Sequence, residues 1–324
     1  MSRWPSRRHF LKTVLGSAAL LVGSGAYAFG IEPAFRLCVQ RYTPKPRNWP
    51  NDLPLRIAAI ADIHIGEPYM PLSRVDEIVA ASNALAPDLI VLLGDYVAGH
   101  RFTTRAIGMA ELAPRLAELR APLGTYAILG NHDWWDDRTA QRNRRGPIIA
   151  ARALHDADVP VLENEAVRLA KDGQPFWLLG LGDQLALLPP KDQQSGRKRL
   201  QGVDDLAGTL AQATDDAPAI LLAHEPDIFP KVPNRVALTL SGHTHGGQVR
   251  LFGYSPLVPS RYGNRYAYGH VVEDERHLIV SGGLGTSILP VRFGVPPEIV
   301  VVDLGAHRAD IASLAPAGPE GTAA

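Results

Sequence analysis

The chain has 324 residues, of which 46% are hydrophobic and 20% are charged, a composition typical of a globular protein and not of a disordered one. Its 33 basic and 33 acidic residues give a formal net charge of zero, so the overall field favours no nucleic-acid partner and none is expected. Cys38 is the only cysteine, which excludes an internal disulfide and a thiolate metal site. Any metal must therefore be held by imidazole, carboxylate or amide oxygen.

The N-terminal residues have the pattern of a targeting segment. Arg7 and Arg8 precede an uncharged stretch over residues 13–30, which contains the small-residue triplet Ala26-Tyr27-Ala28. This pattern resembles a twin-arginine export signal over residues 1–28, which the twin-arginine export machinery would carry to the periplasm or cell envelope. The alternative is an anchor in the cytoplasmic membrane, because about 18 apolar residues can span a bilayer.

A polar, proline-containing connector follows over residues 29–54, with a possible edge strand at 31–42. Beyond it, a domain over residues 55–305 contains five short apolar runs that end abruptly in residues of metal-ligand type. The runs are 55–61 before Asp62 and His64, 89–93 before Asp95, 126–129 before Asn131 and His132, 219–223 before His224, and 236–240 before His243 and His245.

The spacing of the first three runs predicts strand, helix, strand units. Asp62 and Asp95 are 33 residues apart, and Asp95 and Asn131 are 36 apart, which fits such units. Amphipathic helices are predicted from Leu72 onward and over residues 106–119. Right-handed crossovers make these strands parallel, so their carboxyl ends meet at one edge, where open α/β sheets bind ligands.

The second part of the domain has a different pattern. Apolar runs at 159–162, 176–181, 249–252, 277–280 and 299–304 are separated by one predicted helix, at 203–213. This favours a second, mixed sheet. The Ala-, Gly- and Pro-rich residues 306–324 are predicted to be a flexible tail.

The polar strand ends are informative as a set. Any one of them alone is more often a simple strand end, and Gly94, Gly130 and Gly242 only show that the chain turns sharply there. Seven such side chains converging at one sheet edge would be costly unless they coordinated something. They are Asp62, His64, Asp95, Asn131, His224, His243 and His245.

The motifs at these positions resemble those of the calcineurin-like metallophosphoesterases in order and spacing. They are Asp62-Ile63-His64, Gly94-Asp95, Gly130-Asn131-His132-Asp133, His224 and Gly242-His243-Thr244-His245. The resemblance implies an α/β fold, a four-layer α/β/β/α sandwich of two mixed sheets, with the metal site at the carboxyl ends of the strands. It also implies two divalent cations, of which Mn, Fe and Zn accept nitrogen and oxygen ligands.

The resemblance further assigns roles to the individual residues. Asp62, His64 and His245 would hold one cation, Asn131, His224 and His243 the other, and Asp95 would bridge both. A metal-bridging hydroxide would hydrolyse a phosphodiester, phosphomonoester or pyrophosphate. His132 would be catalytic, protonating the leaving oxygen or stabilising charge, although it could instead buttress a ligand. Asp133 could orient His132 or cap a helix.

Two C-terminal segments suggest a branch of the family. Residues 283–287 and 289–294 resemble members with an N-terminal signal or anchor, related to the lipid A precursor enzyme UDP-2,3-diacylglucosamine pyrophosphatase and to exported cell-envelope phosphoesterases. A small-molecule or lipid-linked phosphate ester is therefore the expected substrate, and a membrane surface is a candidate partner. Candidate substrate contacts are Trp134, Trp135 and Arg138, with packing and solvation as their alternative roles. The alternative functions are an inactive binding scaffold and a protein serine/threonine phosphatase.

Overall fold

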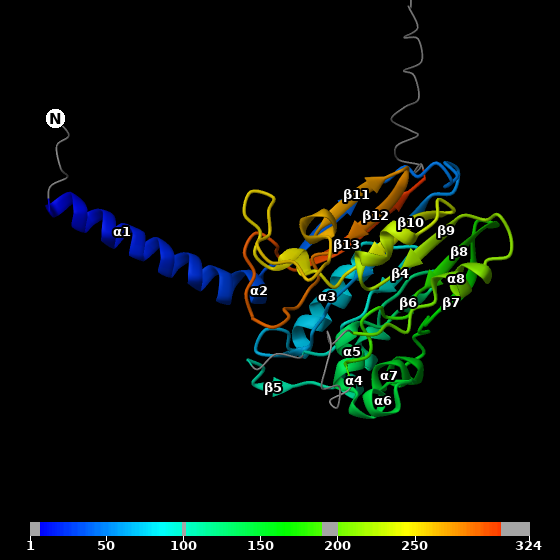
Figure 1. Ribbon diagram of the computed structural model, residues 1–324, viewed down its shortest axis with the longest axis horizontal. Helices are drawn as coiled ribbons and strands as arrows, with labels where there is room; N and C mark the ends of the chain where they lie inside the picture. The colour runs from blue at the N-terminus through cyan, green and yellow to red at the C-terminus, as the bar shows by residue number, and fades with distance from the viewer. Residues whose placement is uncertain (1–6, 99–101, 190–199, 306–324) are drawn as a thin grey trace, which may run out of the picture.

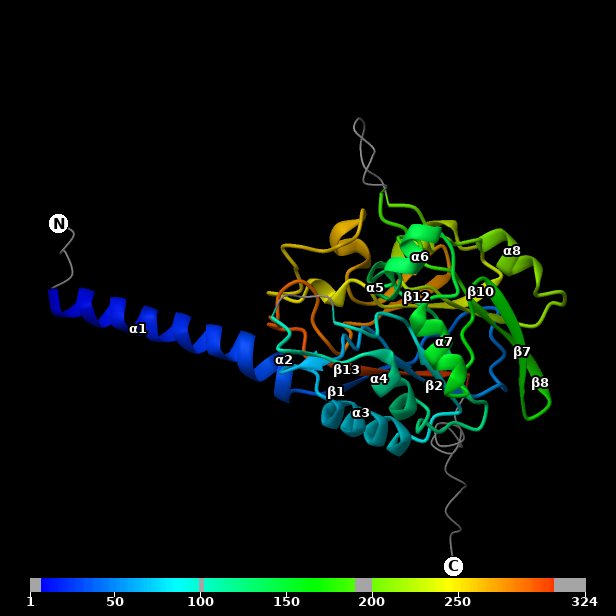
Figure 2. The same ribbon diagram turned by 90° about the horizontal axis from the view of Figure 1, so that it is seen from below.

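Two β-sheets pack face to face at the centre of the molecule, and helices cover their outer faces (Figure 1, Figure 2). The computed structural model describes residues 7–98, 102–189 and 200–305. The order of layers is α/β/β/α, which confirms the predicted fold class. The expected tail at 306–324 lies outside the described residues.

The first sheet has five strands in the order β1-β13-β2-β4-β6. Strands β2, β4 and β6 are parallel, as the spacing predicts, whereas β13 runs antiparallel to β2 and parallel to β1. The predicted edge strand is present as β1. The bounds are β1 Cys38–Tyr42, β2 Leu55–Ile60, β4 Leu89–Leu92, β6 Thr125–Ala127 and β13 Glu298–Leu304.

Helices cover the outer face of this sheet. In α3 (Leu72–Ala84) the buried residues Val75, Ile78, Val79 and Ser82 recur at helical spacing, so one face packs into the core cluster beneath the sheet. Helices α4 (Met109–Leu116) and α7 (Ile149–Asp156) contribute to the same cluster. Two short helices, α5 (Asn131–Asp136) and α6 (Arg138–Asn143), follow β6, and a two-stranded ribbon joins β3 (Gly66–Glu67) to β5 (Arg105–Ala106).

The second sheet has six strands in the order β11-β12-β10-β9-β8-β7. Its four central strands are parallel, and an antiparallel hairpin forms each edge. The bounds are β7 Glu165–Lys171, β8 Gln174–Gly180, β9 Ala219–Leu222, β10 Val236–Ser241, β11 Gly269–Glu273 and β12 Arg276–Val280.

The predicted strands of this second sheet were partly wrong. The run at 299–304 is a strand, but it forms β13 of the first sheet. Residues 159–162 and 249–252 form only isolated bridges, Ala127 with Val161 and Val249 with Phe293, because they run along loops that border the sheets. Strands β7 and β11 were not predicted. Strands β9 and β10 are buried along their whole length, and residues such as Val91, Phe176 and Ile220 fill the space between the sheets.

The fourth layer is thin. The helix predicted at 203–213 is the shorter α8 (Leu206–Ala211), which lies on the outer face of the second sheet with the 3-10 helix η2 (Pro226–Lys231). Two further 3-10 turns, η3 (His245–Gly247) and η4 (Gly263–Tyr266), lie in the loops after β10.

A helix at the N-terminus projects from this body (Figure 1). Helix α1 (Arg7–Ala26) continues through the π-helical turn η1 (Tyr27–Ile31) into α2 (Glu32–Phe35), and the whole segment is long and apolar enough to cross a membrane. Its last turns are docked on the body. The Ala28 carbonyl accepts a hydrogen bond from Arg292 N (2.9 Å), and the Glu32 carboxylate accepts one from Val295 N (2.8 Å).

Candidate metal centre

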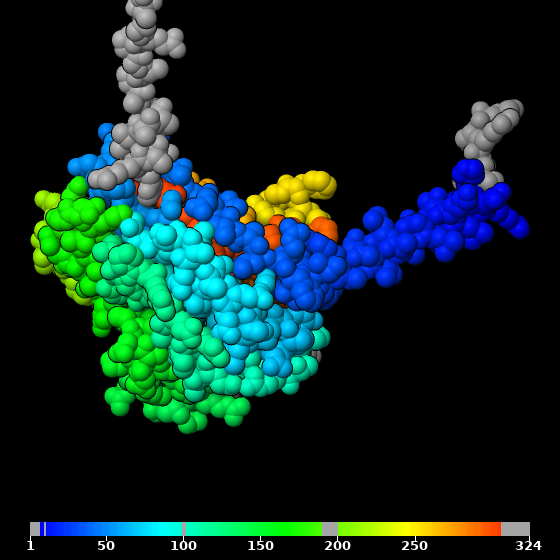
Figure 3. Space-filling view, turned by 180° about the vertical axis from the view of Figure 1, so that it is seen from behind, coloured from blue at the N-terminus to red at the C-terminus, as the bar shows by residue number. Residues whose placement is uncertain are grey.

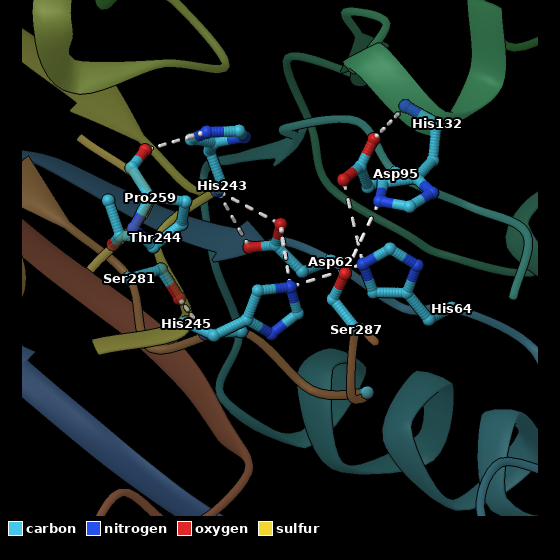
Figure 4. Close-up of polar contacts among 12 residues, drawn as sticks. Asp62, His64, Asp95, His132, His243, Thr244, His245, Pro259, Ser281 and Ser287 are labelled. Atoms are coloured by element: carbon cyan, nitrogen blue, oxygen red, sulfur yellow. Dashed lines mark hydrogen bonds and ion pairs between the residues drawn. The ribbon is translucent and has the colours of Figure 1, made fainter. Parts of the chain in front are cut away.

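The seven residues predicted as metal ligands all lie at the carboxyl ends of five strands, where the two sheets meet. Strands β2, β4 and β6 place their ligands from the first sheet, and β9 and β10 place theirs from the second. Figure 4 shows how side chains from both sheets point toward one another. Segments distant in sequence are brought together because parallel strands end at the same edge.

Asp62, His64 and His245 form the first ligand group, whose possible donor atoms lie within 4.8 Å of one another. The Nε2 atoms of His64 and His245 are 3.1 Å apart, and His245 Nε2 lies 3.6 Å from Asp62 Oδ1. All three side chains are buried. Water therefore does not solvate these polar atoms, and they face one another.

Asn131, His224 and His243 form the second ligand group. His243 Nδ1 lies 2.8 Å from Asn131 Oδ1, and His224 Nε2 lies 3.2 Å from Asp95 Oδ2. The same Asp95 oxygen is 3.5 Å from His64 Nε2 in the first ligand group. Asp95 therefore lies between the two groups.

Carbonyl oxygens fix the orientation of three imidazole rings. His64 Nδ1 lies 3.0 Å from Val97 O, His224 Nδ1 lies 2.6 Å from Leu93 O, and His243 Nε2 lies 3.0 Å from Pro259 O. A carbonyl only accepts, so each of these nitrogens carries the hydrogen. The opposite nitrogen of each ring then presents its lone pair to the centre, which is the arrangement that metal-binding histidines require.

Several ligand residues have an unusual backbone. Asp62, His64, Asp95, His243 and His245 all have positive φ, between 44° and 68°. A residue with a side chain adopts this left-handed conformation at a cost, and such strain gathers at functional sites. The turn aims each side chain inward immediately after its strand, where a regular continuation of the strand would not.

Two glycines leave the room that these side chains need. A Cβ on Gly130 would collide with Asp95 Oδ1 and with the ring of His224, at 2.7 Å from its Cε1. Gly94 has a φ of 90°, and a Cβ there would lie 2.5 Å from Gly130 N. The loops after β4 and β6 therefore approach closely only because both positions are glycine.

Burial and close charges shift the pKa values of the centre in opposite directions. Burial raises the pKa of Asp62 to about 7, lowers that of His64 to about 3 and lowers those of His243 and His245. Burial acts against the charged forms of Asp95 and His224 as well, but their mutual attraction holds the pKa of Asp95 well below its usual range and that of His224 well above.

These residues fit divalent cations. His224 Nε2 is buried and makes no hydrogen bond, although Asp95 Oδ2 is close, so a buried ring nitrogen is left without a partner. The donors are imidazole nitrogen, carboxylate oxygen and amide oxygen, in two groups that share Asp95. Such a set can hold two cations and bring them to a phosphate.

His132 lies beside this centre without belonging to either ligand group. Its backbone N donates to Asp95 Oδ1 (2.8 Å), and its Nε2 lies 3.3 Å from Ser287 Oγ. Its ring centroid is 5.0 Å from that of His64 and 5.1 Å from that of Trp135. Partial exposure leaves its imidazole free to meet a bound molecule.

Asp133 ties the loops together. Its carboxylate accepts hydrogen bonds from the backbone N atoms of Gly130, Asp95 and Tyr96, each at 2.9 Å. It therefore caps helix α5 and joins the loop after β4 to the loop after β6, which fits the capping role considered from the sequence. Burial raises its pKa to about 7.

The three residues considered for substrate contact lie in different environments. Trp134 is buried in the core cluster, which favours its alternative packing role. Trp135 is partly buried beside His132 and donates from Nε1 to the Leu185 carbonyl (2.9 Å). Arg138 is exposed at the start of α6.

Sequence reasoning missed three groups that support the centre. Arg292 is fully buried, donates to the carbonyls of Gly282 and Val295, and places Nη2 3.3 Å from His245 Nδ1. Asp183 and Glu225 form a further buried group with His224. The signals were available for the two carboxylates, because Gly182-Asp183 follows the apolar run 176–181 and Glu225 follows His224 after β9, whereas the lone Arg292 lies in a Gly- and Pro-rich segment without a strand before it.

Comparison with known proteins adds a family to this geometry. A family described as calcineurin-like phosphoesterase matches residues 55–247. The sequence is 32% identical over 307 residues to a Bacillus subtilis protein named uncharacterized metallophosphoesterase YkuE, covering 92% of this chain and 97% of that protein. It is 28% identical over 306 residues to an Escherichia coli protein named phosphodiesterase YaeI, covering 92% and 99% respectively. A dimetal phosphatase from Danio rerio superposes with a TM-score of 0.40 at 13% identity, covering 71% of this chain and 88% of that one.

Proposed function

The chain belongs to the calcineurin-like phosphoesterase family, and from that premise we propose that it hydrolyses a phosphodiester, phosphomonoester or pyrophosphate at the two ligand groups that share Asp95. The single observation that carries the proposal is this shared carboxylate between two buried sets of nitrogen and oxygen donors. A complete set of ligands also argues against an inactive scaffold.

Each residue has a part in the proposed reaction. Asp62, His64 and His245 would hold one divalent cation, Asn131, His224 and His243 would hold the other, and Asp95, which lies between the two groups, would serve both. Bound cations of this kind lower the pKa of water and neutralise phosphate charge. The carbonyls of Val97, Leu93 and Pro259 keep the imidazole lone pairs directed at the cations. Mn, Fe and Zn suit these donors.

His132 is proposed to donate a proton to the leaving oxygen. Its imidazole is partly exposed beside the centre, and its backbone is held by Asp95. An imidazole so placed can donate a proton to a departing alkoxide. Ser287 Oγ, 3.3 Å from Nε2, keeps the ring turned to the centre.

The test uses the purified full chain in detergent with Mn²⁺ and a soluble aryl phosphodiester. His64→Ala should lower kcat/KM by more than about 100-fold. Loss of a residue that only hydrogen-bonds to a metal ligand already lowers metal affinity or activity by about 10- to 100-fold. The matched control is His155→Ala on α7, whose side chain is 87% exposed and which should keep the wild-type rate. Equal rates for both variants and the wild type would refute the proposal.

The proposed substrate is a lipid-linked or UDP-diacylglucosamine-like phosphate ester of the cell envelope, for which UDP-diacylglucosamine serves as the test compound. The similarity of residues 283–287 and 289–294 to that branch and the apolar N-terminal helix support it. The measurement compares UDP-linked glucosamine with and without two acyl chains. A higher kcat/KM for the acylated compound is expected, and a preference for the unacylated one would rule the lipid out.

The proposed location is the cell envelope, reached by the twin-arginine route, with the helix kept as an anchor. Ala28 is buried and its carbonyl is bonded to Arg292, so processing after Ala28 would break a contact of the folded domain. Retained residues 1–28 in N-terminal sequencing of the native protein would support the anchor. Replacing both Arg7 and Arg8 by lysine should abolish export if the twin-arginine route is used.

A further inference from the structure

Large apolar side chains are exposed unevenly on the described part of the molecule that follows α1. The most exposed are Phe35, Phe252, Tyr254, Leu257 and Ile288, each at 62% or more, while every other large apolar residue there is at 53% or less. Phe35 lies in α2, at the base of the helix. The loop segments that carry the other four, at 251–257 and 288–289, lie at the end of the body from which the helix emerges (Figure 1, Figure 2).

These two segments are here named the apolar rim. The residues that flank them join the segments to each other and to the helix. Arg250 N donates to Phe293 O and Phe293 N to Gln248 O, each at 2.8 Å. The Phe293 ring packs edge-on against Tyr27 of η1, with centroids 6.0 Å apart. Figure 3 shows the yellow residues of the rim standing beside the base of the blue helix. Rim and helix base are therefore one continuous surface.

The backbone of the rim is costly for apolar residues. Phe252 has a φ of 51° and Ile288 a φ of 47°. Glycine or asparagine adopts this left-handed conformation cheaply, whereas a bulky or β-branched residue there is an outlier. Neither side chain gains compensating burial in the described structure. An apolar surface of this kind marks a site of interaction.

The helix indicates what the rim meets. The uncharged stretch over residues 13–30 of this helical segment has 18 residues, which at about 1.5 Å each span about 27 Å, close to the roughly 30 Å of a bilayer's hydrocarbon core. A helix that leaves the body in this direction and enters a bilayer brings the end of the body at its base against the membrane surface. We propose that the apolar rim inserts into the boundary between headgroups and acyl chains of the bilayer that holds α1.

The rim also borders the metal centre. The loop after Leu257 supplies Pro259 O to His243, and Ser287, next to Ile288, lies beside His132. Insertion would therefore hold the metal centre at the depth where lipid phosphates lie. This consequence for catalysis rests on the proposed hydrolysis, whereas the insertion itself does not.

The experiment places nitroxide labels on the full chain in nanodiscs of phosphatidylcholine and phosphatidylglycerol. Phe252→Cys, Ile288→Cys and the control Val272→Cys are each made with Cys38→Ser, which removes the only native cysteine. Val272 is 53% exposed and lies in β11, paired with His277 at the end of the sheet away from the metal centre. Collision rates with oxygen and with a water-soluble nickel complex report the depth of each label.

Labels at 252 and 288 should gain oxygen collisions and lose nickel collisions, while the label at 272 keeps the opposite pattern. Three labels that behave alike in water would overturn the proposal. Loss of both kinds of collision at 252 and 288, with spin-spin broadening, would show a second copy of the chain on the rim and would overturn it too. Hydrolysis of the soluble aryl phosphodiester by the same labelled proteins separates this outcome from failure of the proposed function.

Discussion

The two ligand groups are similar in donor chemistry but are supported by opposite charges. Behind the first ligand group lies the guanidinium of Arg292, which stays protonated at neutral pH although burial lowers its pKa to about 10. Behind the second lie the carboxyl groups of Asp183 and Glu225, within reach of His224; burial and the neighbouring Glu225 raise the pKa of Asp183 well above its usual value, so the pair supplies one negative charge and not two. A buried positive charge repels a cation and a carboxylate attracts one. The second ligand group should therefore bind its cation more tightly than the first, and it should be occupied at a lower concentration of the metal.

The largest effect is expected where the two groups meet. Asp95→Asn removes the carboxylate that both share, so neither site stays intact and kcat/KM should fall to the assay background. Metal analysis should show loss of both cations. A metal-free unfolding curve close to wild type is the control for folding. A variant that lost one cation alone would show that Asp95 does not bridge.

A smaller effect is expected from a residue that serves neither group. His132→Asn keeps a backbone N for Asp95 but removes the imidazole, so kcat should fall by about 10²- to 10⁴-fold, the usual contribution of a proton-transfer group. Metal content should stay at the wild-type value. If metal is lost with activity, His132 only buttresses the ligands.

The third prediction concerns the buried carboxyl groups behind the second ligand group. Glu225→Gln removes the charge and retains an acceptor for Gln184, whose N and Nε2 both bond Oε2. The tighter of two Mn²⁺ binding events in calorimetry should weaken by about 10- to 100-fold, with the weaker event unchanged. Glu165→Gln, at an exposed position, is the control. Equal weakening of both events would contradict the assignment of charge to one group.

The smallest effect is a gain in stability. Free Mn²⁺ at ten times a site's Kd should raise the free energy of unfolding by about 1.4 kcal/mol for that site. If the two groups differ in affinity, a titration followed by thermal melting should rise in two steps, and a chelator should reverse both. A single step would mean that the groups fill together.

The sequence predicted the positions of the ligands well because strand ends are a local signal. Each of the five apolar runs became a strand that ends just before its ligand, and the intervals between Asp62, Asp95 and Asn131 predicted parallel pairing. The left-handed turns at these residues were not predictable, because Asp and His adopt a positive φ only occasionally, whereas glycine adopts it readily.

The errors have physical causes too. Strand β7 has mixed burial and weak hydrophobicity, but the turn Asp172-Gly173 that follows it is a typical hairpin signal and could have revealed it. Residues 249–252 contain three apolar residues beside Arg250 without forming a strand, because Leu251 and Phe252 are exposed on the rim. Arg292 acts from a distant loop, and no local pattern connects it to His245.

The docking of the N-terminal helix has a practical consequence for anyone who shortens the chain. Starting at residue 55, where the family similarity begins, would discard the edge strand β1 and the carboxylate of Glu32 that binds Val295 N. A soluble version that begins near Gly25 keeps both, together with the Ala28 carbonyl that receives Arg292 N. The folded domain therefore starts well before residue 55, directly after the apolar helix ends.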